Sequence, residues 1–284
     1  MNEEKTTIGF IGQGYVGKNY ADECEARGYT VVRYALEEPY RANKEKIKGC
    51  DIVFISVPTP TTPEGFDSSI IESVIPLTGS GKTVVIRSTV LPGTTEALQS
   101  KYPDRILLHV PEFLSERVAS VEATRPVMNI VGYPLDSHMH LEQTARILSI
   151  LPQARFSFIM TAREAELQKY IHNTHGFMRV VFTNLMYDLA NKLECDWGKI
   201  RSAMDADPML SPYYNNPLHK SGRGAGGSCF IKDFAAFKRM YEQVMNDPQN
   251  LAVLNALEAK NLALLKDSHK DQDIVKSVYG PKRT

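Results

Sequence analysis

The stretch TIGFIGQGYVG, residues 7–17, decides the fold of this chain. Its first five residues are mostly apolar or β-branched and predict a strand. Residues 16–27 then predict a helix, which ends at Gly28. A strand that passes through a glycine-rich turn directly into a helix is typical of the first βα unit of a nucleotide-binding domain.

The turn has the spacing G-x-G-x-x-G, formed by Gly12, Gly14 and Gly17. The first glycine permits a tight turn, the second lets a pyrophosphate approach the backbone, and the third lets the helix pack against the strand. Free N–H groups at the helix N-terminus then face the phosphates. We therefore expect a dinucleotide to bind here, beside Tyr15 and Val16. A glycine-rich turn without a ligand is the alternative.

The first half of the chain alternates short apolar runs with helical stretches. Strands are predicted at 7–11, 30–34, 51–57, 82–87, 105–110, 127–131 and 156–159. Continuous β-branched runs separated by helices are typical of a parallel sheet that is buried on both faces. The sequence therefore predicts an α/β, doubly wound Rossmann-type domain over residues 1–160.

The character of the sequence changes near Thr161. Residues 162–194 form one long helical pattern without proline. Shorter helices are predicted at 197–204, 231–244 and 250–267, and residues 205–227, rich in Pro, Gly, Asn and Tyr, are predicted to be a loop. We expect an all-α second domain over 161–284, built on the long helix.

Composition agrees with two domains, since the chain has 284 residues and domains average about 150. Lys+Arg and Asp+Glu are both 33, and this zero net charge argues against a nucleic-acid partner. No apolar run approaches the roughly 20 residues of a membrane helix, and the polar N-terminus does not suit a signal peptide. The four cysteines form no CxxC pair and no metal site. These features predict a cytoplasmic protein with reduced thiols and no membrane partner.

The end of the second predicted strand bears on the choice of dinucleotide. An acidic residue usually stands there and binds the ribose hydroxyls, but this chain has Ala35. Glu37 and Glu38 follow closely and could serve from the next turn, so we expect NAD. Arg33 and Arg41 lie nearby and keep NADP open.

The stretch GAGGSCFIKD, residues 224–233, places Cys229 at the start of a predicted helix, after three glycines. The N–H groups and dipole of a helix N-terminus favour a thiolate. Lys232 and Asp233 follow at i+3 and i+4, on the same side of the helix. This pattern is typical of an activated nucleophile. A buried structural cysteine is the alternative, and it is our interpretation of the other three cysteines.

On the long helix, Lys169 and Asn173 are spaced i, i+4 and share one face. They either point into a cleft or belong to a solvated face, and the spacing alone does not decide between the two.

Six motifs occur in order over residues 12–233. They are GQGYVG at 12–17, VPTP at 57–60, STVLPGTT at 88–95, PEFLSE at 111–116, Ala165-Glu166 with Lys169-Tyr170 and Asn173, and GGSC at 226–229 with Lys232-Asp233. Through them the sequence resembles the UDP-glucose/GDP-mannose dehydrogenase family of NAD-dependent nucleotide-sugar dehydrogenases.

The resemblance implies a four-electron oxidation, such as UDP-glucose to UDP-glucuronate, of the kind used in polysaccharide biosynthesis. A primary alcohol loses a hydride to NAD, and the aldehyde is held as a thiohemiacetal on Cys229. A second NAD takes another hydride and leaves a thioester, from which water releases the carboxylate. A cysteine nucleophile is what the covalent step needs.

The resemblance also implies roles for the other catalytic positions. Lys169 and Asn173 steady the substrate oxygen and its developing negative charge. Asp233 works with Lys169 on a bound water. Glu112 contacts the substrate and serves in thioester hydrolysis, and the hydroxyl of Thr89 lies near the reacting carbon.

Cofactor and substrate contacts follow from the same resemblance. Glu116 and Lys232 match positions near the nicotinamide. The loops that run along the cofactor contain Val57, Pro58, Thr59, Ser88 and Thr89. Gly226 is expected beside the substrate, and Lys220 and Arg223 could meet its diphosphate.

The sequence departs from the family in length and at two positions. Family members usually carry a third, C-terminal domain that closes over the nucleotide, whereas only 17 residues follow Asp267. A partner chain would then supply that domain, or the substrate would be smaller. Met209 stands where the family often has an arginine that reaches the neighbouring subunit's sugar, and Ala35 is the other departure.

In the family the long helix forms a dimer core, so we expect a homodimer.

Two other functions remain open at this point. One is a two-domain β-hydroxyacid dehydrogenase acting on a smaller substrate, which needs no cysteine. The other is a non-catalytic NAD-binding partner of a full-length dehydrogenase.

Overall fold

The computed structural model of the protein describes residues 6–114, 118–220 and 222–281. The chain divides into two compact units. The first unit comprises residues 1–59 and 67–169, and the second comprises 60–66 and 170–284. The division falls inside the long helix α6 (Ala162–Lys192), whose first two turns belong to the first unit.

A seven-stranded sheet with the order β2-β1-β3-β6-β7-β8-β9 forms the centre of the first unit. Its strands are β1 (Thr7–Ile11), β2 (Thr30–Tyr34), β3 (Ile52–Ile55), β6 (Thr83–Ile86), β7 (Ile106–His109), β8 (Met128–Tyr133) and β9 (Phe156–Thr161). The order places β1 between β2 and β3, so the strand order reverses beside β1. Dinucleotides bind at this kind of switch point in doubly wound sheets. The predicted α/β class and all seven predicted strands are confirmed.

One strand pair differs from the all-parallel sheet that the sequence predicts. β8 is antiparallel to β7 and parallel to β9. The helix between β7 and β8, α4 (Ala119–Thr124), has only six residues and packs against α1 (Tyr15–Ala26). β8 therefore runs back from the edge of the sheet where β7 ends. By contrast, α5 (His138–Ile150) has 13 residues and carries the chain across to the parallel strand β9.

The core of the first unit lies between the sheet and its helices. Phe10 of β1 stacks on Phe54 of β3, with 5.2 Å between ring centroids, and both are buried. Tyr20 and Cys24 of α1 pack on the same cluster. The described residues of this unit also form η1 (Arg41–Gly49), α2 (Ser69–Val74), η2 (Ile75–Leu77) and α3 (Thr94–Lys101).

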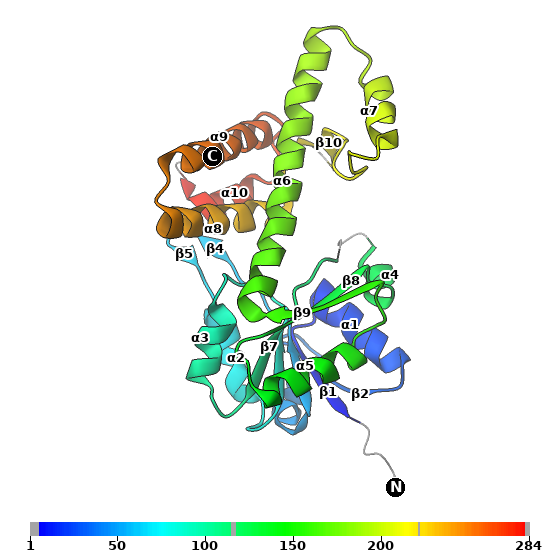
Figure 1. Cartoon of the computed structure of the whole chain (residues 1–284), viewed down its shortest axis with the longest axis vertical. Helices are drawn as coiled ribbons and strands as arrows, with labels where there is room; N and C mark the ends of the chain where they lie inside the picture. Colours follow the sequence, from blue (N-terminus) through cyan, green and yellow to red (C-terminus); the bar gives the residue numbers. More distant parts are fainter. Residues whose placement is uncertain (1–5, 115–117, 221, 282–284) are drawn as a thin grey trace. The chain divides into compact units, whose positions relative to one another are not determined.

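The second unit is built on α6, which has 31 residues, as the sequence predicts. In the view of Figure 1, α8 (Gly227–Met245), α9 (Pro248–Asp267) and α10 (Gln272–Tyr279) lie on one side of the helix, and α7 (Trp197–Ala206) lies on the other. The unit also contains two short hairpins, β4 (Thr61–Thr62) with β5 (Gly65–Phe66) and β10 (Leu218–His219) with β11 (Gly222–Arg223).

Three details of the second unit differ from the sequence prediction. Helix α8 begins at Gly227 and not at Ile231, because glycine's low helix propensity hides the first turn. The predicted loop 205–227 contains the β10–β11 hairpin. Residues after Asp267 form α10, whose buried Val275 and Val278 share one helix face.

No helix in the described part of the chain has both the length and the apolar character that a membrane span requires.

Candidate active site

The glycine-rich turn after β1 has the geometry that its motif predicts. Gly12 has φ +90°, and a Cβ there would lie 2.2 Å from the carbonyl oxygen of Ser56. A Cβ on Gly17 would lie 2.0 Å from the carbonyl oxygen of Gly12. Both positions therefore require glycine so that β1, β3 and α1 can approach one another.

Gly14 differs from the other two glycines. No atom lies within 4 Å of the position of its Cβ, so the backbone here faces open space. Gly14 caps α1 without a side-chain hydrogen bond, and no acidic residue stands in the first turn. Tyr15 is 41% exposed at the same place, and Val16 packs on the core. An open approach to the N-terminus of α1 fits a pyrophosphate.

Hydrogen bonds join the loop that follows β3 to the loop that follows β6. Ser88 Oγ accepts from the Val57 N–H at 3.0 Å and donates to the Val57 carbonyl at 2.7 Å. Thr59 Oγ1 donates to the Thr89 carbonyl at 2.8 Å. Ser88 and Thr59 are buried, whereas Pro58, between Val57 and Thr59, is exposed. These bonds hold the two loops at the carboxyl edge of the sheet, where doubly wound folds bind ligands.

The end of β2 supports NAD over NADP. Arg33 is committed to two carboxylates of α1, at 2.6 Å from Asp22 and 2.7 Å from Glu25. Ala35 is buried, and the exposed Glu37 and Glu38 follow it. An arginine already in two ion pairs is poorly suited to hold a 2′-phosphate.

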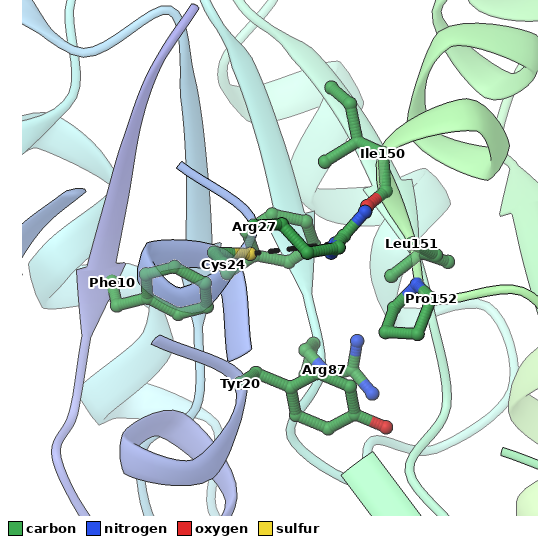
Figure 2. A pocket seen from close by; sticks show the side chains of 9 residues that line it. Phe10, Tyr20, Cys24, Arg27, Arg87, Ile150, Leu151 and Pro152 are labelled. Atoms are coloured by element: carbon green, nitrogen blue, oxygen red, sulfur yellow. Dashed lines mark hydrogen bonds between the residues drawn. The ribbon is translucent and has the colours of Figure 1, made fainter. Parts of the chain in front are cut away.

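Glu112 lies after β7 and is almost completely buried. Its Oε1 accepts from the N–H groups of Phe113 and Leu114, both at 2.7 Å, and its Oε2 accepts from the guanidinium of Arg87. Figure 2 shows the Arg87 guanidinium over the ring of Tyr20, 3.7 Å from its centroid, at one side of a small pocket. Burial opposes the charge of Arg87, but Tyr20 and Glu112 outweigh it and raise its pKa.

Sequence reasoning missed Arg87 because it lies just before the STVLPGTT motif, at the end of a strand where apolar residues prevail. Its neighbour His109 is also fully buried, and burial together with the charges of Arg87 and Lys169 lowers the His109 pKa to about 3. This imidazole is therefore neutral, and Arg87 with Glu112 forms the charged pair of this region.

The first turns of α6 place Lys169. Glu166, also buried, accepts hydrogen bonds from the N–H of Gly93 at 2.6 Å and from the N–H of Thr95 at 2.8 Å, and so caps α3. One turn later, Lys169 is 9% exposed and its Nζ lies 5.3 Å from the ring centroid of Phe113. Lys169 is therefore directed at the Glu112–Leu114 turn and does not belong to a solvated face.

Asn173 lies one turn after Lys169 and is buried in the second unit. Its Nδ2 donates to Asp233 Oδ2 at 2.5 Å, and Lys232 Nζ donates to Asp233 Oδ1 at 2.5 Å. Asp233 is 1% exposed. Three residues that the sequence selected from two distant stretches thus form one polar cluster between α6 and α8.

Cys229 is exposed in the first turn of α8, and Cys195 is the other exposed thiol. A close approach of the helices supports this turn. The ring of Phe230, next to Cys229, would come within 2.9 Å of a Cβ on Gly176, the one glycine of α6. Cys24 and Cys50 are buried, and burial raises their pKa to about 12 and about 11, which makes them inert.

The remaining predicted residues have mixed surroundings. Lys220 lies at the tip of the β10–β11 hairpin and has φ +55°. Arg223 pairs with Asp188 at 2.5 Å and bonds to Asn184, so its guanidinium is already occupied. The space beside Gly226 is filled by residues that follow α9. Glu116 lies outside the described residues.

Comparison with protein families supports this description. Residues 35–148 match the NAD binding domain of the UDP-glucose/GDP-mannose dehydrogenase family, and residues 163–261 match the central domain of the same family. The first match identifies NAD as the cofactor.

A curated relative and two solved structures show how far the similarity extends. A UDP-glucose 6-dehydrogenase of Pseudomonas aeruginosa is 31% identical over 234 residues, which are 76% of this chain and 49% of the relative. The chain spans about half the length of the curated relatives it matches. A UDP-glucose dehydrogenase structure from Pyrobaculum islandicum has a TM-score of 0.78 at 23% identity, covering 94% of this chain and 72% of that one.

The other solved structure is a 3-hydroxyisobutyrate dehydrogenase of Mycobacterium tuberculosis. It has a TM-score of 0.71 at 14% identity and covers 97% of this chain and 98% of its own. At these identities both structures show a shared fold only.

Proposed function

Since this chain belongs to the UDP-glucose/GDP-mannose dehydrogenase family, we propose that it oxidises the primary alcohol of a nucleotide sugar to a carboxylate with NAD, as in the conversion of UDP-glucose to UDP-glucuronate. The observation that carries this proposal is the second unit's cluster. An exposed Cys229 stands at the N-terminus of α8. One turn later on the same helix, Lys232 and the buried Asp233 form a hydrogen-bonded network with the buried Asn173 of α6.

The cofactor would be held by residues of the first unit. The open backbone at Gly14 and the N-terminus of α1 suit its pyrophosphate. The loops with Val57, Thr59 and Ser88 suit its nicotinamide half. Bound NAD accepts a hydride from the carbon that is oxidised in each of the two oxidation steps.

The side chains would divide the remaining chemistry among them. Lys169 and Asn173 stabilise negative charge on the substrate oxygen while its proton is lost. The Cys229 thiolate adds to the resulting aldehyde carbon and forms a carbon–sulfur bond, which gives a thiohemiacetal. After the second oxidation this bond belongs to a thioester. A water oriented by Asp233 and Lys169 attacks the thioester, the carbon–sulfur bond breaks, and Cys229 is regenerated.

The surroundings of Glu112 argue against a direct role in thioester hydrolysis. Both of its carboxylate oxygens are already occupied, by Arg87 and by the N–H groups of Phe113 and Leu114. We infer that Glu112 shapes the turn that Lys169 faces, and that its part in hydrolysis acts through this turn.

A second candidate function is supported by a specific observation. A 3-hydroxyisobutyrate dehydrogenase matches the fold over nearly its whole length. An enzyme of that kind would transfer one hydride from a small hydroxyacid and would not need Cys229. The exposed thiol beside a buried Asn–Asp–Lys network has no purpose in such a reaction.

We also propose that the protein forms a homodimer through α6. Ile171, Met178, Phe182, Leu185 and Leu189 are all at least 37% exposed along this one helix. Exposed apolar side chains at this density are typical of a protein interface.

Detection of the covalent intermediate tests the proposed function. The chain is incubated with NAD and UDP-glucose, quenched in acid during turnover, and analysed by intact mass and peptide mapping. We expect a nucleotide-sugar adduct on Cys229 that is absent in Cys229→Ser and unchanged in Cys195→Ser, which removes the other exposed thiol. Uronate formation without any dependence on Cys229 would contradict the proposal. Turnover of 3-hydroxyisobutyrate in place of nucleotide sugars would favour the second candidate.

A further inference from the structure

The backbone loop in front of Cys229 is held by side chains from one distant segment. We call residues 222–227 the glycine loop, and Asn261, Ser268, Lys270 and Asp271 the clamp. All of them belong to the second unit. The sequence gives no motif for the clamp, and the predicted helices end before three of its four members.

Each clamp residue bonds to a different backbone group of the glycine loop. Ser268 Oγ accepts from the Arg223 N–H at 3.0 Å. Lys270 Nζ donates to the Gly224 carbonyl at 2.9 Å. Asn261 accepts from the Ala225 N–H at 2.7 Å and donates to the Ala225 carbonyl at 3.0 Å. Asp271 Oδ2 accepts from the Gly227 N–H at 2.7 Å.

The glycines are what allow this close contact. A Cβ on Gly226 would lie 2.1 Å from Asp271 Oδ2 and 2.6 Å from Lys270 Cε. A Cβ on Gly222 would lie 2.6 Å from Ser268 Oγ. By contrast, no atom lies within 4 Å of a Cβ on Gly227. The clamp therefore covers one side of the loop and leaves open the backbone at the start of α8.

The bond from Asp271 is a helix cap made from outside the helix. Gly226 is the N-cap residue of α8 and has no side chain to cap the first turn. Asp271 supplies the missing acceptor to Gly227, two residues before Cys229. Its own backbone has φ +52°, at the start of α10, whose Val275 and Val278 pack on Ile231 of α8. The cap is thus tied to the same helix that it caps.

We propose that Asp271 and Lys270 are positioning residues for the nucleophile: through the glycine loop they hold the first turn of α8, and with it the backbone N–H groups around Cys229, in one conformation. This inference rests on the proposed function, because it takes Cys229 to be the nucleophile. It extends that function to a segment, residues 268–271, that no motif of the family marks in this sequence.

The test compares two substitutions that each replace Asp271 by an uncharged residue. Asp271→Asn keeps an oxygen acceptor for the Gly227 N–H, whereas Asp271→Gly removes it, and both residues tolerate the left-handed backbone there. Since both variants lose the same charge, their difference isolates the hydrogen bond. Asp273→Asn is the matched control, because Asp273 is an exposed acid of the same helix.

Two readouts need neither sugar nor cofactor. The first is amide hydrogen exchange over residues 224–229, which we expect to be about tenfold faster in Asp271→Gly than in Asp271→Asn, the size of effect that a lost cap gives. The second is the rate of Cys229 alkylation by iodoacetamide, relative to Cys195 in the same molecule. We expect it to be several-fold slower in Asp271→Gly, and near the wild-type rate in Asp271→Asn and Asp273→Asn.

Equal exchange and equal alkylation in Asp271→Gly and Asp271→Asn would overturn the proposal, as would a uniform rise in exchange over the whole second unit. If Asp271→Gly does not fold, Lys270→Met serves in its place, because it keeps the aliphatic packing against Gly226 and loses the bond to Gly224 together with the charge beside Asp271. Because both readouts are independent of turnover, failure of the oxidation assay would leave this test intact.

Discussion

At the scale of single residues, the buried pair of Arg87 and Glu112 is the strongest test of the first unit's site. Removing one partner of a buried ion pair leaves an uncompensated charge, which costs about 3–5 kcal/mol. We therefore expect Arg87→Met alone to lower the free energy of unfolding by that amount. The double variant Arg87→Met/Glu112→Gln should recover most of it, because Gln keeps an oxygen acceptor for the N–H groups of Phe113 and Leu114 and carries no charge. Urea denaturation measures both, and additive losses in the double variant would show that the two groups are not coupled.

A second residue makes stability depend on pH. Burial raises the pKa of Glu166 from 4.5 to about 7, against the hydrogen bonds from Thr95 and Gly93. A carboxyl with a raised pKa in the folded state contributes stability below its unfolded pKa and loses it as the pH rises through the folded pKa. The difference in unfolding free energy between the wild type and Glu166→Gln should therefore shrink by about 3 kcal/mol from pH 4.5 to 8. A difference that stays constant over this range would refute the assignment.

At the scale of elements, the βα turn separates folding from cofactor binding. Gly17→Ala would place a Cβ 2.0 Å from the Gly12 carbonyl, so we expect a large loss of thermal stability. Gly14→Ala meets no atom within 4 Å and should unfold near the wild-type temperature. Its methyl group would enter the space that suits the pyrophosphate, so NAD should bind at least about tenfold more weakly by calorimetry. Wild-type NAD affinity in Gly14→Ala would mean that the cofactor does not approach this turn.

Some helices and strands can be predicted from local sequence patterns, and others cannot. β1, the G-x-G-x-x-G turn and α6 follow from local patterns, and the structure confirms them. Hydrophobic periodicity places the start of α8 too late, because the glycines before it mask a first turn whose Gly227 N–H is capped by Asp271, a residue outside the helix. The antiparallel direction of β8 could not be predicted, because hydrophobic periodicity carries no signal for strand direction.

The site residues that belong to sequence motifs could be predicted, whereas those identified only by tertiary contacts could not. Cys229, Asp233 and Asn173 come from motifs, and the structure gathers the last two into hydrogen-bonding distance. Arg87 and Lys270 act through tertiary contacts with residues 25 and 46 positions away, so neither has a local signature.

At the scale of the whole molecule, the exposed apolar stripe of α6 predicts the assembly state. Phe182→Glu places a charge in the middle of this stripe and should convert a dimer to a monomer in sedimentation velocity. Val253→Glu is the matched control, because Val253 is similarly exposed but lies on α9. An unchanged sedimentation coefficient in Phe182→Glu, or an equal change in both variants, would exclude α6 as the dimer interface.

The central claim is that one chain carries a nucleotide-sugar alcohol through two oxidations on Cys229. The most direct measurement is the amount of reduced NAD formed per nucleotide sugar consumed, with the sugar limiting and Cys229→Ser assayed in parallel. We predict two reduced NAD per uronate formed by the wild type, and no uronate from Cys229→Ser. One reduced NAD per substrate, with Cys229→Ser equally active, would contradict the claim and identify a simple alcohol dehydrogenase.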